Sequence, residues 1–455
     1  MILVDYPVLP GPRCLSRPTR HRHLRHTSHI SHDFAGALAR LMTFTHQLRL
    51  DMTRRTTPGS LRLIHVTTVP MTLNFFRGQI AFLKEHGFVV QAISSPDKEG
   101  SLAAFGCDEG IEVHAVPMAR RMAPAFDIVS LARLYRLLRE LRPDVVHSHS
   151  PKAALLGTLA ARISGVPHVV LSIFGLPQMT KTGLSLRVLN AMTKLECRLA
   201  DKVWCDSFSM RSYVIEQKLC RADKVVVLAS GSVNGVDSMK TFSPEYQAAR
   251  RDRIRELMRI PSQDLVIGFV GRITADKGMH ELAQAWRRLS VERSDVHLLL
   301  VGPFESEDPL SAEDFALLHE HSRVHLADMQ TDVAPFFAAM DIFVMPSHRE
   351  GFGVTNIEAA AMSLPVVSTS IPGCVDSVQD GVTGTLVPAK DGDSLLVALR
   401  RYCADAELRR EHGQAGRRRV VADFRPEEIW QQLSSLYRGL ATHSRHRDPA
   451  KRALD

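Results

Sequence analysis

Long apolar runs, paired cysteines and aromatic side chains are all scarce in this sequence of 455 residues. No run approaches the roughly 20 apolar residues that a membrane-spanning helix needs. The opening MILVDYPVLPGP does not resemble a secretory signal, because its apolar part is short, carries Asp5 and is interrupted by two prolines. We therefore expect a cytoplasmic protein. The length predicts two domains with additions, at roughly 100–200 residues per domain.

The few cysteines and aromatic residues exclude further classes. The seven cysteines are odd in number and form no Cys-x-x-Cys pair, so we expect reduced thiols rather than a disulfide framework or a zinc site. Aromatic residues make up only 6% of the chain. A protein that binds single-stranded nucleic acid needs base-stacking aromatics among its basic residues. We therefore expect no nucleic-acid partner.

Three nucleotide and metal motifs are missing or isolated. No G-x-G-x-x-G follows the first predicted strand, which disfavours a dinucleotide oxidoreductase, and no G-x-x-x-x-G-K-[ST] indicates a P-loop enzyme. The only Asp-x-Asp joins Asp391 to Asp393 in a late loop, where it predicts a turn and a helix cap. The sequence therefore predicts no bound metal.

The net charge of +8 is divided unevenly along the chain. Residues 1–60 carry nine Lys and Arg against three Asp and Glu, or +6. Residues 61–235 carry 21 against 14, or +7, and residues 236–455 carry 27 against 32, or −5. A basic half can bind nucleic acid or an anionic membrane, or it can be a solvated, arginine-rich face. Composition leaves these alternatives open.

Residues 1–58 differ from the rest of the chain. The piece RPTRHRHLRHTSHISHD is rich in Arg and His without apolar periodicity, which predicts disorder rather than a functional metal site. Met52 precedes the first predicted strand, and we hypothesise that translation starts there. An intact mass beginning at Met1 for the product of the native gene would contradict this hypothesis.

From residue 61 onwards, short β-rich runs alternate with helical patterns, which is typical of parallel sheets in α/β domains. The first series begins with the strand LRLIHVTTV and the helix NFFRGQIAFLKEHG. The stretch GSVNGVDSMKTFSPEY interrupts the alternation and is predicted to link two domains. A second series runs from LVIGFVGR to GTLVPA.

We predict one Rossmann-like domain over 59–235, a second over 236–440, and a basic tail over 441–455. Two such domains meet across a cleft, and ligands of open α/β sheets bind beyond the carboxyl ends of the strands. Motifs at those ends are therefore the candidates for chemistry.

The motif VGRITADKG combines two cations with a helix start. Gly271 and Arg272 end a predicted strand, and Lys277 precedes a predicted helix. Two cations beside a helix N-terminus suit a diphosphate. The alternative is a basic turn with Lys277 in solvent.

The motif HREGFGVTNIEAAAM places carboxylates on both sides of a glycine turn. Gly351 and Gly353 would let a ligand approach the backbone, and the free amides at the helix start can receive oxygens. Glu350 lies in the loop, and Glu358, about one turn into the helix, can accept two hydrogen bonds from a vicinal diol such as ribose. The alternative is that Glu350 complements the helix dipole and Glu358 lies on the surface.

The motif HSHSPKA follows a strand of the first half. His147 and His149 alternate with serines, so both are expected to point to one side of the strand end. A metal site would need further ligands, and none is evident. The pattern favours a structural role or contact with an acceptor.

Taken together, these motifs resemble the GT-B-fold retaining glycosyltransferases of family 4, over roughly residues 61–440. PSHREGFGVTNIEAAAMSLPVV is similar to the family's E-x7-E block, and GRITADKG to its Arg/Lys diphosphate block. VGPFESEDPL and ASGSVNGVD, together with HSHSPKA, resemble the subgroup that builds bacterial capsule, exopolysaccharide and O-antigen units on a lipid carrier.

The resemblance implies two Rossmann-like domains, the first for the acceptor and the second for a nucleotide sugar. It implies transfer of a hexose or N-acetylhexosamine, with retention, to a hydroxyl of a lipid-linked saccharide acceptor in surface polysaccharide synthesis. UDP is the usual nucleotide of the subgroup. The nucleotide sugar is a substrate, and no cofactor or metal is implied, because the two cations can replace the metal.

The resemblance also assigns roles to residues. Arg272 and Lys277 would stabilise the charge that develops on the leaving diphosphate, Glu350 would contact the donor sugar, and Glu358 would bind the ribose. The amides that follow Glu350 would cradle sugar and phosphate. The implied catalytic residues are Arg272, Lys277 and Glu350. The implied donor-binding set is Gly271, Arg272, Lys277, Glu350, Phe352, Gly353, Val354, Thr355 and Glu358. His147, His149 and Lys152 are implied on the acceptor side.

Two further segments and two departures complete the comparison with the family. Residues 324–329 would lie by the base, and FRPEEIWQQLSSLY would be a C-terminal helix that crosses back to the first domain. Many members carry a histidine or threonine where this chain has Phe174, so a catalytic polar role at that position is in doubt. TTVPMTLN replaces the glycine-rich loop that often follows the first strand.

The resemblance also gives the basic first half a use. ARRMAPAFDIVSLARLYRLLRELRP and TKTGLSLRVLNAMTKLECRLADK set arginines and lysines beside leucines. We hypothesise that these segments dock on anionic lipid at the inner face of the cell membrane. The alternative is that they only pack on the sheet through their leucines.

Two other functions remain open at this point. One is a nucleotide-sugar epimerase or another GT-B enzyme without a saccharide acceptor. The other is a non-catalytic scaffold that binds a nucleotide sugar within a polysaccharide assembly complex.

Overall fold

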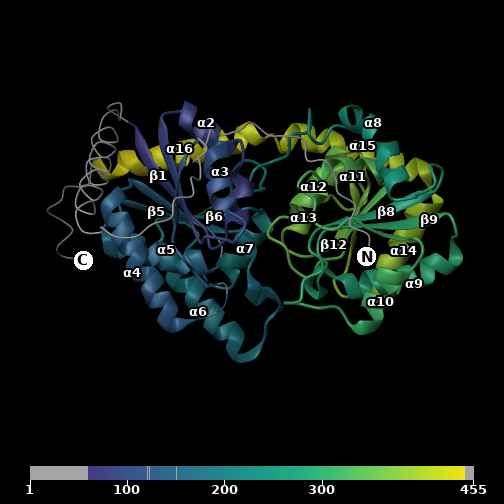
Figure 1. The fold of residues 1–455 in the computed structure, drawn as a ribbon, viewed down its shortest axis with the longest axis horizontal. Helices are drawn as coiled ribbons and strands as arrows, with labels where there is room; N and C mark the ends of the chain where they lie inside the picture. The colour runs from purple at the N-terminus through teal and green to yellow at the C-terminus, as the bar shows by residue number, and fades with distance from the viewer. Residues whose placement is uncertain (1–59, 120, 122, 150, 446–455) are drawn as a thin grey trace, which may run out of the picture. The chain divides into compact units, whose positions relative to one another are not determined.

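The computed structural model describes residues 60–119, 121, 123–149 and 151–445. The Arg/His-rich extension, the hypothesised start at Met52 and the tail beyond residue 445 lie outside the described residues, so expectations about them stay predictions. The described chain forms two parallel sheets with helices packed on them (Figure 1). The predicted α/β class with two Rossmann-like domains is therefore confirmed, while the domain boundaries stay predictions.

The first sheet has seven parallel strands in the order β3-β2-β1-β4-β5-β6-β7. Its winding reverses between β1 and β4, and such a switch point is where ligands bind in open α/β sheets. The strands are β1 Leu61–Val66, β2 Phe88–Ser94, β3 Glu112–Ala115, β4 Val145–Ser148, β5 His168–Ile173, β6 Lys202–Cys205 and β7 Val225–Val226.

The predicted helix over NFFRGQIAFLKEHG is wrong in its first half. The chain forms a 3-10 helix, η1 Pro70–Phe76, and then a separate helix, α2 Gln79–Glu85. Gly78 divides them with a φ of +78°, and a Cβ there would lie 2.9 Å from the Trp430 ring. The left-handed conformation of Gly78 ends one helix before the next begins, and the Trp430 ring leaves no room there for a larger residue.

The other helices of this half connect successive strands on the two faces of the sheet. They are α3 Ser101–Glu109, α4 Pro124–Leu141, α5 Pro151–Ser164, η2 Pro177–Thr180, α6 Gly183–Leu199 and α7 Phe208–Glu216.

The second sheet has six parallel strands in the order β10-β9-β8-β11-β12-β13, with the switch point between β8 and β11. The strands are β8 Leu265–Val270, β9 Val296–Val301, β10 Val324–Leu326, β11 Ile342–Met345, β12 Val366–Thr369 and β13 Gly384–Val387. The helices are α8 Pro244–Leu257, η3 Ala275–Lys277, α9 Met279–Glu292, α10 Ala312–Glu320, α11 Ala334–Ala339, α12 Val354–Ala361, α13 Cys374–Ser377, α14 Gly392–Ala404, α15 Ala406–Asp423 and α16 Pro426–Arg445.

Packing on both faces explains the uninterrupted apolar strands. Every residue of β5 and of β9 is buried, as expected for parallel strands covered by helices on both sides. The predicted apolar face of α9 is confirmed, because Leu282, Trp286 and Leu289 each have 1% of their surface exposed. The predicted cap at Asp391 is confirmed too, since its Oδ1 accepts a hydrogen bond of 2.9 Å from the Ser394 amide at the start of α14.

The C-terminal helix α16 packs on the first half of the chain, beside α2 and β1 (Figure 1). Ile429, Leu433 and Tyr437 are fully buried in the same core cluster as residues of β1 and β2. The indole of Trp430 donates a hydrogen bond of 2.6 Å to the side chain of Asn234. Buried apolar area therefore ties the end of the chain to its first sheet.

Among the described residues, no helix is both long enough and apolar enough to cross a bilayer.

Candidate active site

The end of β8 brings the first predicted motif to the edge of the second sheet. Gly302, after β9, has a φ of +135°, and a Cβ there would collide with the carbonyl oxygen of Gly271. This close approach fixes the turn from which Arg272 extends. The Arg272 Nη1 atom lies 2.8 Å from Oε2 of Glu305, and about half of the arginine side chain is exposed. Arg272 is thus held by one carboxylate while part of it stays accessible.

The turn after Arg272 packs against the loop after β11. Gly278 begins α9 with a φ of +72°, and a Cβ there would collide with the carbonyl oxygen of Pro346. Lys277, the preceding residue, reaches Glu350, with its Nζ 2.5 Å from Oε1. The Ser347 hydroxyl donates to the same oxygen over 2.7 Å. The cation of the first motif and the first carboxylate of the second therefore share one site.

Polar contacts of neighbouring residues fix this loop further. The Arg349 guanidinium lies 2.7 Å from Oδ2 of Asp276, and the His348 amide donates 2.9 Å to the Asp276 carbonyl. His348 Nε2 lies 3.1 Å from Oε2 of Glu281 on α9. Loop 346–350 is thus bound to the turn that carries Lys277 at several points, which preorganises the charged pair.

The glycine turn touches the first half of the chain. A Cβ at Gly351 would lie 2.6 Å from the carbonyl carbon of Phe174, and the Gly351 carbonyl accepts a hydrogen bond of 2.7 Å from Ser207. Phe352 points away into the core, with 1% of its surface exposed and its ring centroid 5.4 Å from that of Phe424. Only the backbone of Phe352 is therefore available to a ligand.

Gly353 starts α12 in the left-handed region, with a φ of +78°. The first amides of an α-helix have no partner within the helix and carry partial positive charge. Thr355, one of the predicted donor-binding residues, donates its hydroxyl to the Met345 sulfur over 3.2 Å. Val354 is half-buried and packs against the core. These two residues can therefore offer their backbone to a ligand.

Glu358 lies one turn further along α12 and is partly buried rather than on the open surface. Desolvation by burial raises the pKa of its carboxyl to about 7. The carboxyl forms no hydrogen bond or ion pair with another described side chain. A half-buried carboxylate without a protein partner is suited to receive the hydroxyls of a ligand.

The structure adds residues that the sequence interpretation missed. Glu305 holds Arg272, and Ser347 holds Glu350. Asp206 lies beside the glycine turn. Asp206 has 2% of its surface exposed, and burial raises its pKa well above the ordinary value. Its Oδ1 has no hydrogen-bond partner among the described residues. Nothing in the spacing of these residues to Arg272 or Glu350 could have identified them.

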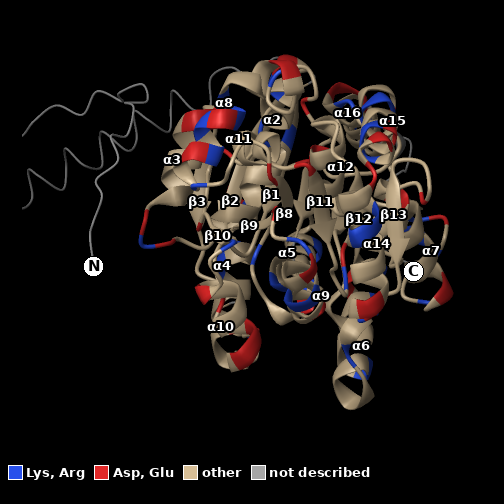
Figure 2. Ribbon diagram, turned by 90° about the vertical axis from the view of Figure 1, so that its right-hand side faces the viewer, with Lys and Arg blue, Asp and Glu red and all other residues tan. Residues whose placement is uncertain are grey.

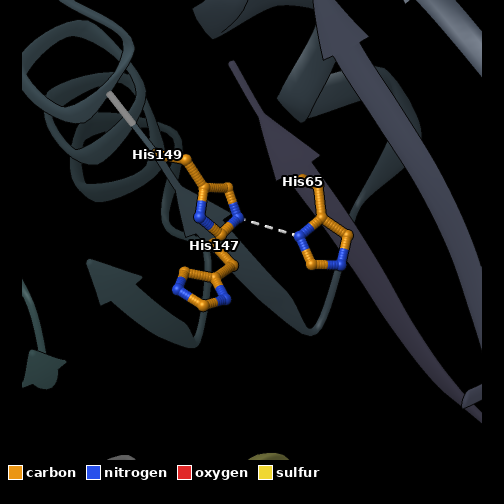
Figure 3. A group of neighbouring side chains, drawn as sticks. All are labelled: His65, His147 and His149. Atoms are coloured by element: carbon orange, nitrogen blue, oxygen red, sulfur yellow. Dashed lines mark hydrogen bonds between the residues drawn. The ribbon is translucent and has the colours of Figure 1, made fainter. Parts of the chain in front are cut away.

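The predicted histidine pair has a third member, His65 on β1 (Figure 3). One ligand atom from each of His65, His147 and His149 lies within 4.8 Å of the others, and all three side chains are fully buried. His65 Nδ1 and His149 Nε2 lie 2.9 Å apart. His65 could not be identified from the sequence, because the residue belongs to an apolar strand pattern.

Hydrogen bonds account for His147 without a metal. Its Nδ1 lies 2.7 Å from the Tyr437 hydroxyl on α16, and its Nε2 lies 2.7 Å from the Ser172 hydroxyl on β5. Metal binding would cost one of these contacts, and a catalytic metal also needs an open position, which a fully buried cluster does not offer. We therefore interpret the cluster as a structural network. The expectation of a site without metal stays a prediction.

The remaining acceptor-side residues also have partners within the first half. Lys152 Nζ lies 2.6 Å from Oδ2 of Asp127, and both side chains are largely buried. The ring of Phe174 packs edge-on against Trp204, with centroids 5.1 Å apart. The side chains of His147, His149 and Lys152 are buried in the structure. Their role in acceptor binding stays a prediction.

Comparison with known proteins identifies the family of this chain. Residues 250–419 match the model described as glycosyl transferases group 1, and residues 63–207 match the model glycosyl transferase 4-like. A capsular polysaccharide biosynthesis glycosyltransferase of Staphylococcus aureus, CapM, is 34% identical over 83% of this chain and 96% of its own length. An Escherichia coli protein is 26% identical over 78% of this chain and 91% of its own. Its name is UDP-Gal:alpha-D-GlcNAc-diphosphoundecaprenol alpha-1,3-galactosyltransferase.

Solved structures agree on the fold. Anabaena HepE in complex with UDP-glucose superposes with a TM-score of 0.68 at 18% identity, covering 83% of this chain and 100% of that one. Two Rossmann-like domains of this kind define the GT-B class of glycosyltransferases. The chain belongs to the group 1 glycosyltransferases, and it is therefore an enzyme that transfers a sugar.

Proposed function

We propose that this enzyme moves a hexose or N-acetylhexosamine from a UDP-sugar to a hydroxyl of a lipid-linked saccharide, with retention, in surface polysaccharide synthesis. The single observation that carries the proposal is the contact between Lys277 and Glu350, with Arg272 on the neighbouring strand end. The capsular relative from Staphylococcus aureus supports the pathway class. The Escherichia coli relative, named for UDP-Gal and a diphosphoundecaprenol-linked GlcNAc, supports the donor and acceptor classes.

The transfer breaks the bond between the anomeric carbon and the diphosphate, and negative charge develops on the leaving group. Arg272, Lys277 and the amides at the start of α12 would stabilise this charge most in the transition state. Glu350, held by Lys277 and Ser347, would position the sugar hydroxyls. Glu358 would hold the ribose.

Retention needs no nucleophile from the protein in this scheme. The acceptor hydroxyl attacks the anomeric carbon from the side that the diphosphate leaves, and its proton passes to an oxygen of the departing phosphate. The products are the extended saccharide and UDP. Two fixed cations beside a helix start can replace a metal, so we propose that catalysis does not depend on one.

The base would lie next to residues 324–329, which run from β10 into the loop after it. The Ala327 amide donates to the Leu300 carbonyl over 2.9 Å, so the loop follows the end of β9. Met329 has 57% of its surface exposed, which leaves it accessible to a planar ring.

The test measures thermal stability in EDTA with UDP, GDP, ADP and CMP. A ligand at 100 times its Kd stabilises a protein by about 2.7 kcal/mol, which is visible as a melting shift. We expect a shift with UDP that Arg272→Ala and Glu358→Ala abolish. Arg250→Ala is the matched control, because Arg250 forms a similar exposed ion pair, 3.2 Å long, with Asp332.

Each result separates the competing functions. A UDP shift followed by UDP release from a UDP-sugar only when saccharide acceptor is added supports transfer. A shift without release of UDP under any condition would favour the scaffold. Release of UDP with an altered free sugar and no acceptor would favour an epimerase.

The membrane location of the acceptor raises a second proposal, that α4 and α6 dock on anionic lipid. On α4, Leu134 and Leu138 pack in the core, whereas Arg133, Arg136 and Arg139 are exposed. Arg120, which was grouped with these residues in the sequence, lies outside the described part of the chain. The leucine packing and the exposed charge thus occupy different faces of one helix.

The helix α6 exposes apolar residues among its cations. Leu184 has 76% and Val188 has 47% of its surface exposed, and Lys and Arg recur along the helix (Figure 2). Exposed apolar side chains between cations are typical of segments that lie on an anionic membrane. Flotation with liposomes should show binding that requires anionic lipid. Equal flotation with neutral liposomes would refute docking by charge.

A further inference from the structure

A cavity of about 220 Å³ lies in the first half of the chain, beyond the end of β5. Residues of η1, the loop through η2, α5 and α6 line it, and it is partly open to solvent. Apolar side chains dominate its walls, among them Phe75, Phe174, Leu176, Leu189 and Met192. None of the residues assigned to the donor lines this cavity.

Polar side chains form the smaller part of the cavity lining, namely Thr72, Ser172, Gln178, Thr193 and Glu196. Gln178 donates its side-chain amide to the Thr193 hydroxyl over 3.1 Å, so these two groups satisfy each other. Glu196, also in the lining, has 7% of its surface exposed, and desolvation raises its pKa to about 8. Burial therefore disfavours the charged form of this carboxyl. A saccharide, with a hydroxyl on most carbons, would bury many polar groups against the apolar part of these walls, whereas a hydrocarbon has none to desolvate.

The position of the cavity links it to the candidate active site. Gly175 belongs to its lining, and a Cβ at Gly175 would lie 3.2 Å from the amide nitrogen of Gly351. Gly351 directly follows Glu350, the residue assigned to the donor sugar. The wall of the cavity therefore touches the glycine turn from the first half of the chain, and the saccharide and diphosphate of an acceptor would span from Glu350 to a hydrocarbon in the cavity.

Apolar surface continues outward from the cavity. Phe75, in the lining, has 53% of its surface exposed, and Met71 on the same 3-10 helix has 54%. On α6, Leu184 and Val188 extend the apolar surface beyond the lining residue Leu189. Lys181, which is exposed, directly follows η2. A hydrocarbon chain with an anionic head group has the chemistry that matches apolar walls beside a cation.

We propose that this cavity binds the isoprenoid hydrocarbon of the acceptor, in the part of the chain that follows the diphosphate. The inference rests on the proposed function, and it adds a site that recognises the lipid rather than the sugar. Binding there would hold the acceptor saccharide beside Glu350 without contacts to every hydroxyl. It would also make chain structure, not only saccharide structure, a determinant of acceptor choice.

The test is calorimetric titration of the full chain with geranylgeranyl diphosphate, kept below its micelle concentration, and with inorganic diphosphate. We expect the lipid to bind at least tenfold more tightly. Leu189→Asp places a charge in the wall, and Met192→Trp fills the space without adding charge. Both should weaken lipid binding about tenfold or more. Leu195→Asp is the matched control, because Leu195 is an exposed residue of the same helix outside the lining, and it should change affinity less than threefold.

The UDP melting shift, measured on the same variants, serves as the folding control and separates the two proposals. Absence of the shift in the unsubstituted protein would count against the proposed function. An intact shift, together with equal affinity for lipid and inorganic diphosphate, would overturn the isoprenoid site alone. Equal weakening by Leu195→Asp and Leu189→Asp would also overturn it, since it would assign the effect to surface charge.

Discussion

Lys277 and Glu350 are 73 positions apart in the sequence, yet the Lys277 ammonium lies 2.5 Å from a Glu350 carboxylate oxygen. The two side chains are only 18% and 15% exposed, so the pair is formed in a partly desolvated place where electrostatic interactions are stronger than in water. A diphosphate arriving there would meet a cation already fixed in position. Because folding already orients this cation, the reaction does not have to order it.

We expect Lys277→Ala to lower kcat by roughly 10²–10³-fold, because a fixed group that stabilises transition-state charge contributes about 3–4 kcal/mol. Donor KM should change less than kcat. Steady-state kinetics of sugar transfer would measure both. The control is Arg288→Ala, which removes an exposed ion pair with Asp393 from the outer face of α9. A comparable loss in both variants would contradict a specific role for Lys277.

The pKa of Glu358, raised to about 7 by burial, predicts that UDP affinity increases with pH through neutrality. Above pH 7 the carboxyl is ionised, and hydrogen bonds to a charged acceptor are stronger than those to a neutral one by about 1 kcal/mol, or roughly fivefold in affinity. The Kd of UDP should therefore fall between pH 6 and pH 8. The Glu358→Gln variant lacks this carboxyl, so its pH dependence reports the titration of UDP itself and serves as the reference. The same pH dependence in this variant would exclude Glu358 as its source.

The buried histidines predict loss of stability in mild acid. Burial lowers the pKa of His65 to about 3 and holds the pKa values of His147 and His149 well below 6.5. Below pH 6.5 these histidines bind protons in the unfolded chain but stay neutral in the folded chain. The free energy of unfolding therefore falls as pH falls. Each histidine contributes at most about 1.4 kcal/mol per pH unit. Urea unfolding between pH 7 and pH 5 would measure the slope.

His65→Gln removes one of these protons and should make the slope shallower by about one proton. The control is Thr158→Ala, a buried substitution on α5 that removes no titratable group and should leave the slope of the unsubstituted protein. If both variants gave the same slope, acid sensitivity would have to come from groups outside the cluster.

Gly278 and Gly100 allow backbone strain to be separated from collision. Their φ values are +72° and +73°, but a Cβ at Gly278 would collide with the Pro346 carbonyl, whereas one at Gly100 would meet nothing within 4 Å. Gly100→Ala should cost about 1–2 kcal/mol, the ordinary penalty of that conformation. Gly278→Ala should cost more and should also reduce transfer, because it displaces the turn that carries Lys277. Equal stabilities of the two variants would mean that the loop after β11 moves aside without a cost in free energy.

Much of the fold and the centre of the site could be predicted because their signals are local. The apolar runs at β8 and β9 are dictated by burial on both faces, and GRITADKG and REGFGVTNIE each keep their spacing within one strand-turn-helix unit. The predictions failed or were silent where distant contacts decide. The helix expected over 74–87 is divided at Gly78, against the Trp430 ring, and Glu305 holds Arg272 from a different loop.

The sequence by itself determined the alternation of strands and helices, the two blocks of charged residues and glycines, and the family to which they belong. These follow from periodicity and from residue types at short spacing, which the backbone reads locally. Only the tertiary structure decided that Lys277 meets Glu350, that His65 completes a buried network with Tyr437, and that an apolar cavity lies beside Gly351. Such pairings depend on how the sheets and α16 pack, and packing joins residues whose separation along the chain carries no signal.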